Sequence, residues 1–153
     1  MVASMNQAPI SQGSRVQLWH EVVREAEDRS GRALGEERES YLVFVLQRHL
    51  QDAYLLARTQ ALEWLAAQEQ IGSARADALR DVGDRCLLIA GLFPGLAARR
   101  RVSVDYYIDL GSGAYDEVAR STRASYADLF AQLARGYREL VVVLRAVRTG
   151  TAG

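Results

Sequence analysis

The sequence predicts an all-α protein of about six helices, which pack as one antiparallel, bundle-like domain. Only two prolines occur in 153 residues, so long stretches can run as uninterrupted helix. Apolar residues recur at helical spacing through most of the chain, and no pair of alternating segments predicts a sheet. A chain of this length can bury a core in one domain without disulfides or metals.

We expect the single helical domain to cover residues 14–148. Residues 1–13 and 149–153 are small, polar and aperiodic, which is typical of flexible tails. Apolar periodicity and helix-ending residues then divide the domain into six expected helices with a short turn at 96–101. The expected helices cover about 14–30, 36–50, 53–70, 74–92, 104–120 and 125–148.

The first two helices carry terminal signals. Ser14 and Gln17 have the spacing of a capping box, and Gly31 suits a left-handed C-terminal cap. The second helix begins with acidic residues at 36, 37 and 39, which complement the positive end of the helix dipole. Its centre, Tyr41 to Leu46, is apolar on every side and would also suit a buried strand. The helix-forming flanks favour a central helix.

The later helices are separated by Gly72-Ser73 and by Pro94-Gly95, with Ser103 as the cap of the fifth. The apolar stripe of the fifth helix keeps its phase through Gly111-Ser112-Gly113, which predicts small residues for close helix approach. A break at these glycines is the alternative, because each interior glycine costs about 1 kcal/mol. The last helix has one long stripe, with a bend expected at Gly136.

Composition excludes several function classes. The 19 basic residues balance 19 acidic ones, so no field attracts nucleic acid. Every basic residue is arginine, which indicates a GC-rich bacterial genome. No apolar run approaches the roughly 20 residues of a membrane span, and the N-terminus lacks a secretion signal. We therefore expect a cytoplasmic protein with no membrane or nucleic-acid partner. The lone cysteine, Cys86, is expected to be a small buried hydrophobe.

Motifs for catalysis, cofactors and metals are missing. The two histidines, His20 and His49, lack the Glu-x-x-His spacing of di-iron bundles, and no Cys-x-x-Cys pair suits zinc. His49 follows a helix-end arginine, which favours a surface position or a helix-dipole partner. Nucleophile-elbow and phosphate-loop patterns are also missing. We expect no catalytic residue, no cofactor and no metal ligand. An enzyme of another type would need a deep pocket with converging titratable groups.

The segment from Asp81 to Tyr115 holds the most distinctive polar side chains. Asp105 and Asp109 lie four residues apart and repel each other unless a cation is near. Three interpretations stay open: an internal network of satisfied polar groups, an exposed docking surface, or an acidic, tyrosine-lined pocket. The candidate residues are Asp81, Asp84, Arg85, Arg99, Arg100, Arg101, Asp105, Tyr106, Tyr107, Asp109 and Tyr115.

Short motifs in the middle of the chain carry a resemblance. They are Tyr41-Leu42-Val43, Asp81-Val82-Gly83-Asp84, Gly91-Leu92-Phe93-Pro94, Arg99-Arg100-Arg101-Val102, Tyr106-Tyr107-Ile108-Asp109-Leu110-Gly111 and Ala114-Tyr115. In these motifs the chain resembles a family of small, uncharacterised helical proteins common in proteobacteria. No activity, cofactor or partner is attached to that family, so no functional residue is carried over.

These observations favour a non-catalytic interaction or regulatory protein. Its partner would be another protein or a second copy of the chain, since arginine and tyrosine are frequent in interfaces. The alternative is a small-ligand or cation-binding protein that uses the acidic, tyrosine-rich cluster of the fourth and fifth expected helices.

Overall fold

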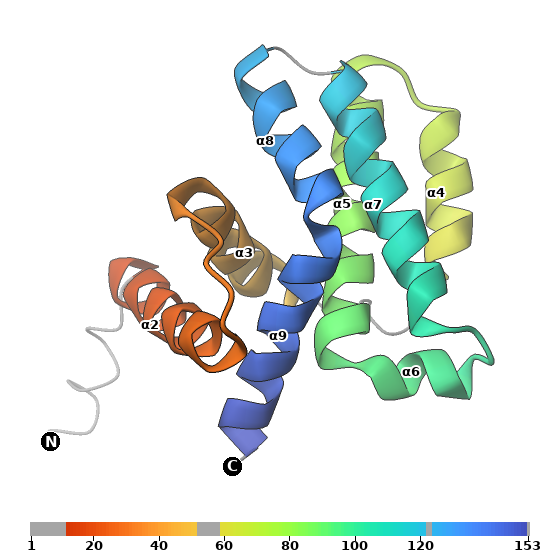
Figure 1. The fold of residues 1–153 in the computed structure, drawn as a ribbon. Coiled ribbons are helices and arrows are strands. Elements are labelled where there is room, and N and C mark those ends of the chain that lie inside the picture. Colours follow the sequence, from red (N-terminus) through yellow and green to blue (C-terminus); the bar gives the residue numbers. More distant parts are fainter. Residues whose placement is uncertain (1–11, 52–58, 122–123, 153) are drawn as a thin grey trace, which may run out of the picture.

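The computed structural model describes residues 12–51, 59–121 and 124–152. These ranges contain eight helices and no strand, and Figure 1 labels the helices α2 to α9. Their bounds are Gln12–Ser30 (α2), Glu36–His49 (α3), Gln60–Gln68 (α4), Gly72–Leu92 (α5), Pro94–Arg99 (α6), Val104–Ser121 (α7), Ala124–Arg135 (α8) and Tyr137–Ala152 (α9).

The all-α class is confirmed, but a count of six helices is wrong for the described residues. The expected turn at 96–101 is largely a helix, α6, because Pro94 occupies its first turn, where a proline loses no hydrogen bond. The expected last helix is two helices, which meet at Gly136. The Nη1 atom of Arg38 lies 2.5 Å from where a Cβ of Gly136 would stand, so a larger residue here would displace the end of the Arg38 side chain.

Two expectations for single helices have opposite outcomes. The continuous fifth helix is confirmed, because α7 runs from Val104 to Ser121 through both glycines, and Ser103 accepts a hydrogen bond from the Tyr106 amide at 3.0 Å. The capping role of Ser14 is wrong, because α2 already begins at Gln12.

The expected tails and the start of the third helix fall partly outside the described residues. Residues 1–11 and 52–58 are among those not described, and α4 is described from Gln60. At the other end, α9 continues to Ala152, through residues expected to form a tail. The division into one domain and two tails stays a prediction.

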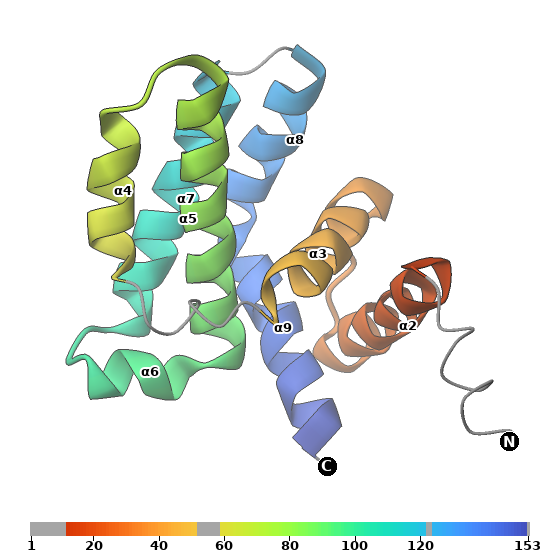
Figure 2. The same ribbon diagram turned by 180° about the vertical axis from the view of Figure 1, so that it is seen from behind.

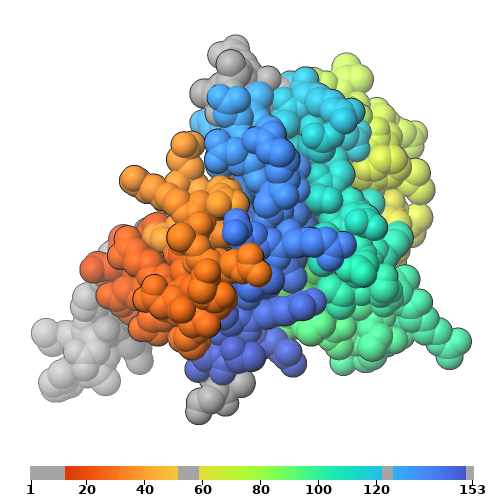
Figure 3. Space-filling view, in the orientation of Figure 1, coloured from red at the N-terminus to blue at the C-terminus, as the bar shows by residue number. Residues whose placement is uncertain are grey.

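The helix α5 occupies the centre of the structure. It packs most extensively against α7 and also contacts α3, α4, α6 and α9. Figures 1 and 2 show a row in which α4 lies on α5, α5 on α7, and α7 on α8. The helix α2 packs on α3 and α9. Figure 3 shows α2 and α3 covering one side of the molecule, with α4 at the opposite edge.

Close helix approach at two glycines positions the site described below. A Cβ on Gly83 of α5 would stand 2.3 Å from the ring of Tyr115, and a Cβ on Gly111 of α7 would stand 2.8 Å from the Cβ of Cys86. Without side chains at these points, α5 and α7 approach closely enough to enclose the tyrosine rings. Cys86 is fully buried, as expected, and burial raises the pKa of its thiol.

None of the helices in the described part of the chain combines the length and apolar character that a membrane span requires.

Candidate functional site

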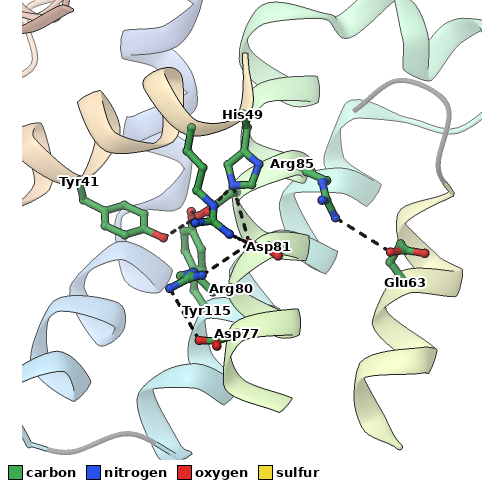
Figure 4. A network of polar contacts seen from close by, with 10 residues as sticks. Tyr41, His49, Glu63, Asp77, Arg80, Asp81, Arg85 and Tyr115 are labelled. Atoms are coloured by element: carbon green, nitrogen blue, oxygen red, sulfur yellow. Dashed lines mark hydrogen bonds and ion pairs between the residues drawn. The ribbon is translucent and has the colours of Figure 1, made fainter. Parts of the chain in front are cut away.

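A buried carboxylate, Asp84, lies on the central helix α5 with 0% of its surface exposed. Its Oδ1 accepts hydrogen bonds from the hydroxyl groups of Tyr41 on α3 and Tyr115 on α7, each at 2.6 Å. Its Oδ2 lies 2.9 Å from Nε2 of His49, at the end of α3 (Figure 4). Polar groups from α3 and α7 therefore satisfy a charge that would be costly to bury alone.

Charged side chains surround this carboxylate on the side that faces solvent. Oδ1 of Asp81 is 3.8 Å from Nε2 of His49, 3.4 Å from Arg48 and 3.8 Å from Arg80. Arg80 also lies 3.8 Å from Asp77 (Figure 4). Three carboxylates of this network, those of Asp77, Asp81 and Asp84, face the guanidinium groups of Arg48 and Arg80 and the imidazole of His49.

The expectation that His49 lies at the surface is wrong, because only 3% of it is exposed. His49 comes three residues after Leu46 and four after Val45, and both of those residues are buried. Residues at this spacing share one helix face, so the sequence did contain the signal for a buried histidine. The role of Tyr41 as a hydrogen-bond donor to Asp84 was also missed, because Tyr41 lies within a run of apolar residues.

Three tyrosine hydroxyls of the site are held in their protonated form. Burial raises the pKa of Tyr41 and Tyr115, and the negative charge of Asp84 raises both further. Burial likewise raises the pKa of Tyr137, whose hydroxyl donates a 2.7 Å hydrogen bond to the carbonyl of Gly83. These phenols act as fixed donors that orient α5 against α3, α7 and α9.

The structure divides the eleven residues of the expected Asp81–Tyr115 cluster. Asp84 and Tyr115 meet in the buried network, and Asp81 borders it. Arg85 instead faces α4, where it lies 4.0 Å from Glu63. Asp105 is exposed and forms an ion pair of 3.0 Å with Arg138 of α9, which relieves its repulsion with the neighbouring Asp109.

The rest of the cluster lies near the far end of α5. From Asp84 to the end of α5 is about 12 Å at 1.5 Å per residue, so the arginine turn and the start of α7 cannot reach the buried carboxylate easily. Tyr106 and Tyr107 stack edge to face at 5.6 Å beside a separate hollow of about 430 Å³ that Arg100 also lines. The exposed residues here are Arg99, Arg101, Tyr106 and Asp109.

A larger hollow, of about 450 Å³, opens beside Tyr41 between α3, α5, α7 and α8. Its walls are mostly apolar and include four aromatic rings, those of Tyr41, Phe44, Tyr126 and Phe130. Phe44 and Tyr126 are 40% and 62% exposed, which is unusual for such large side chains. The volume lies within the range of small-molecule pockets.

The charged residues in the wall of this hollow are Arg80 and Asp77. Within the described residues Arg80 makes no hydrogen bond: its Nε is buried without a partner, and both of its ion contacts are 3.8 Å long. A guanidinium offers five N–H donors in a planar fork, and leaving such donors unused is costly. The hollow therefore combines an aromatic surface with an arginine that has a buried Nε without a partner and no short hydrogen bond from its terminal nitrogens.

Comparison with protein-family models, with curated protein sequences and with solved structures finds no match to this chain, and its resemblance to small proteobacterial helical proteins stays a prediction.

Proposed function

We propose that the protein binds a small amphipathic carboxylate in the hollow between α3, α5 and α8. The apolar body of the ligand lies against the rings of Tyr41, Phe44 and Phe130, and its carboxylate accepts hydrogen bonds from Arg80. The observation that carries the proposal is the buried, unpartnered Nε of Arg80 in the wall of an aromatic hollow. This proposal takes up ligand binding, the alternative that the sequence left beside an interaction or regulatory role, and moves the site from the acidic cluster to its edge.

The chemistry of the walls supports this class of ligand. Aromatic and aliphatic groups bury their surface against rings, while a planar carboxylate matches the guanidinium fork. A charged hydrogen bond contributes about 1.5–3 kcal/mol, which corresponds to roughly 10- to 100-fold in affinity. Because Tyr41 also donates to Asp84, the buried network fixes one wall of the hollow before any ligand arrives.

The test compares acids with their neutral amides by isothermal calorimetry and thermal shift. The probes are indole-3-acetate, phenylacetate and octanoate, each paired with its primary amide of nearly identical shape. We expect at least one acid to bind at least about tenfold more tightly than its amide. The substitution Arg80→Gln should remove that preference. Arg138→Gln, which changes an exposed arginine on α9, should leave it unchanged.

Two results would contradict the proposal. One is equal binding of every acid and its amide, which would mean that no charged contact is made. The other is an unaltered preference for the acid in the Arg80→Gln protein, which would place the carboxylate elsewhere. Circular dichroism of each variant shows whether the fold is kept.

A second candidate, self-association, rests on a different surface. Leu62 and Leu65 on α4 and Ile71 before α5 are 62%, 54% and 85% exposed. Neighbouring exposed apolar side chains favour contact with a second copy of the chain.

Light scattering after gel filtration should then give a dimer. The substitution Leu65→Asp should weaken this dimer, whereas Leu18→Asp, an exposed control on α2, should not. A monomer at all concentrations would exclude this candidate. We also propose a cytoplasmic location and a regulatory role for the protein, both of which the sequence predicts.

A further inference from the structure

The polar network beside the hollow contains three metal-ligating side chains that the ligand-binding proposal does not use. His49, Asp81 and Asp84 each offer one donor atom, and these atoms lie within 4.8 Å of one another. We propose that His49, Asp81 and Asp84 bind a divalent first-row transition ion, with Zn²⁺ as the best-fitting member of that class. This inference is independent of any ligand in the hollow.

The distances fit such an ion. Zinc lies about 2.0–2.2 Å from nitrogen and oxygen ligands, so the ligand atoms of a tetrahedral site stand about 3.4 Å apart. Nε2 of His49 is 2.9 Å from Asp84 and 3.8 Å from Asp81, values on either side of this spacing. Small side-chain rotations of His49 and Asp81 would therefore complete a three-residue ligand set.

The surroundings of Asp84 orient it as a ligand. Both tyrosine hydroxyls donate to Oδ1, which leaves the Oδ2 lone pairs directed toward His49. Outer hydrogen bonds of this kind hold a ligating carboxylate in one orientation. Because the phenols are uncharged, they satisfy hydrogen bonding without neutralising the buried charge. A metal ion between His49 and Oδ2 of Asp84 would add positive charge on the side that the phenols leave open.

The donor set selects among metals. One imidazole nitrogen with two carboxylate oxygens suits zinc, manganese or iron, whereas calcium and magnesium prefer oxygen alone. Asp81 is half-buried and lines a further hollow of about 240 Å³ beside α4, which gives an ion access from solvent. The three residues leave one position of a tetrahedral ion for water. Arg48, which lies 3.4 Å from Asp81, must give way when the ion binds.

The test measures zinc binding to the full chain after chelator treatment, by calorimetry and by elemental analysis of the dialysed protein. We expect one Zn²⁺ per chain. Asp81→Asn keeps the shape of the side chain but weakens a ligand, and we expect it to lower the affinity by at least about tenfold. His49→Gln, which can still donate a hydrogen bond to Asp84, should do the same. Asp105→Asn changes an exposed carboxylate away from the cluster and should change nothing.

Two outcomes would overturn the proposal. If the parent protein retains no stoichiometric zinc or manganese, the three residues form a hydrogen-bonded network and not a metal site. If Asp81→Asn and Asp105→Asn bind zinc as tightly as the parent, the ion lies elsewhere. Should His49→Gln fail to fold by circular dichroism, Asp81→Asn decides the question, because its half-buried side chain tolerates the change.

Discussion

Two glycines on α7 provide a sensitive test of the packing between α5, α7 and α9. Gly111 and Gly113 lie in the same helix, and neither has a positive φ. A Cβ on Gly111 would stand 2.0 Å from the Tyr137 hydroxyl and 2.8 Å from the Cβ of Cys86, whereas a Cβ on Gly113 would meet nothing within 4 Å. The substitutions Gly111→Ala and Gly113→Ala should therefore change stability in opposite directions.

The magnitudes follow from three terms. Forcing a methyl group into a packed interface costs about 1–3 kcal/mol, and displacing Tyr137 weakens its hydrogen bond to Gly83, worth about 1 kcal/mol. Alanine in a helix gains about 1 kcal/mol over glycine. Gly111→Ala should thus destabilise the fold by about 1–3 kcal/mol. Gly113→Ala has only the helical gain and should stabilise it by about 0.5–1 kcal/mol.

The assay is urea unfolding followed by circular dichroism, with thermal unfolding as a second measure. For a chain of this size, 1 kcal/mol corresponds to roughly 2–4 °C in the unfolding midpoint. The slope of the urea transition should be unchanged in both variants, because neither alters the surface exposed on unfolding. A stabilised Gly111→Ala protein would refute the reasoning, since it would show that α5 and α7 can separate without cost.

Three further predictions concern the buried groups. Asp84→Asn should cost about 3–5 kcal/mol in urea unfolding, because it leaves the histidine beside it without its buried partner; a loss below about 1 kcal/mol would contradict this. Tyr41, Tyr115 and Tyr137 have raised pKa values, so the folded state keeps their protons longer than the unfolded state, and stability should fall as pH rises above 10.0. Tyrosinate absorbance during an alkaline titration should show these phenols ionising together with unfolding. Cys86, whose pKa burial also raises, should react with a thiol reagent only at the rate of unfolding; rapid reaction in the folded state would contradict its burial.

Local patterns in the sequence determined much of the fold. Periodic apolar residues located α5 and α7, because a helix with one buried face must repeat that face every three to four residues, and helix-forming flanks located α3. The helical phase across Gly111 and Gly113 correctly outweighed their low helix propensity. Two details were misjudged: the last expected helix is two helices that meet at Gly136, and α2 begins before Ser14, its expected cap.

The candidate site was less accessible to sequence reasoning. The aspartates and tyrosines from Asp81 to Tyr115 were recognised as distinctive, yet only some of them meet, and their key partners come from α3. The separation of Asp84 from the arginine turn follows from helix geometry and could have been worked out. The contact of Tyr41 and His49 with Asp84 could not have been worked out, because the local sequence does not show which face of α3 packs on α5.

The sequence alone thus determined the helices, the small residues where helices approach and the polar side chains that stand out from the core. These properties depend on hydrogen bonds and periodicity within one segment, so neighbouring residues in the sequence determine them. The tertiary structure decided which polar groups share a partner: it placed Tyr41, His49 and Tyr115 around Asp84 and left Arg80 at the wall of a hollow. That outcome depends on how whole helices pack, because a buried charge is satisfied by whichever donors the packing brings to it.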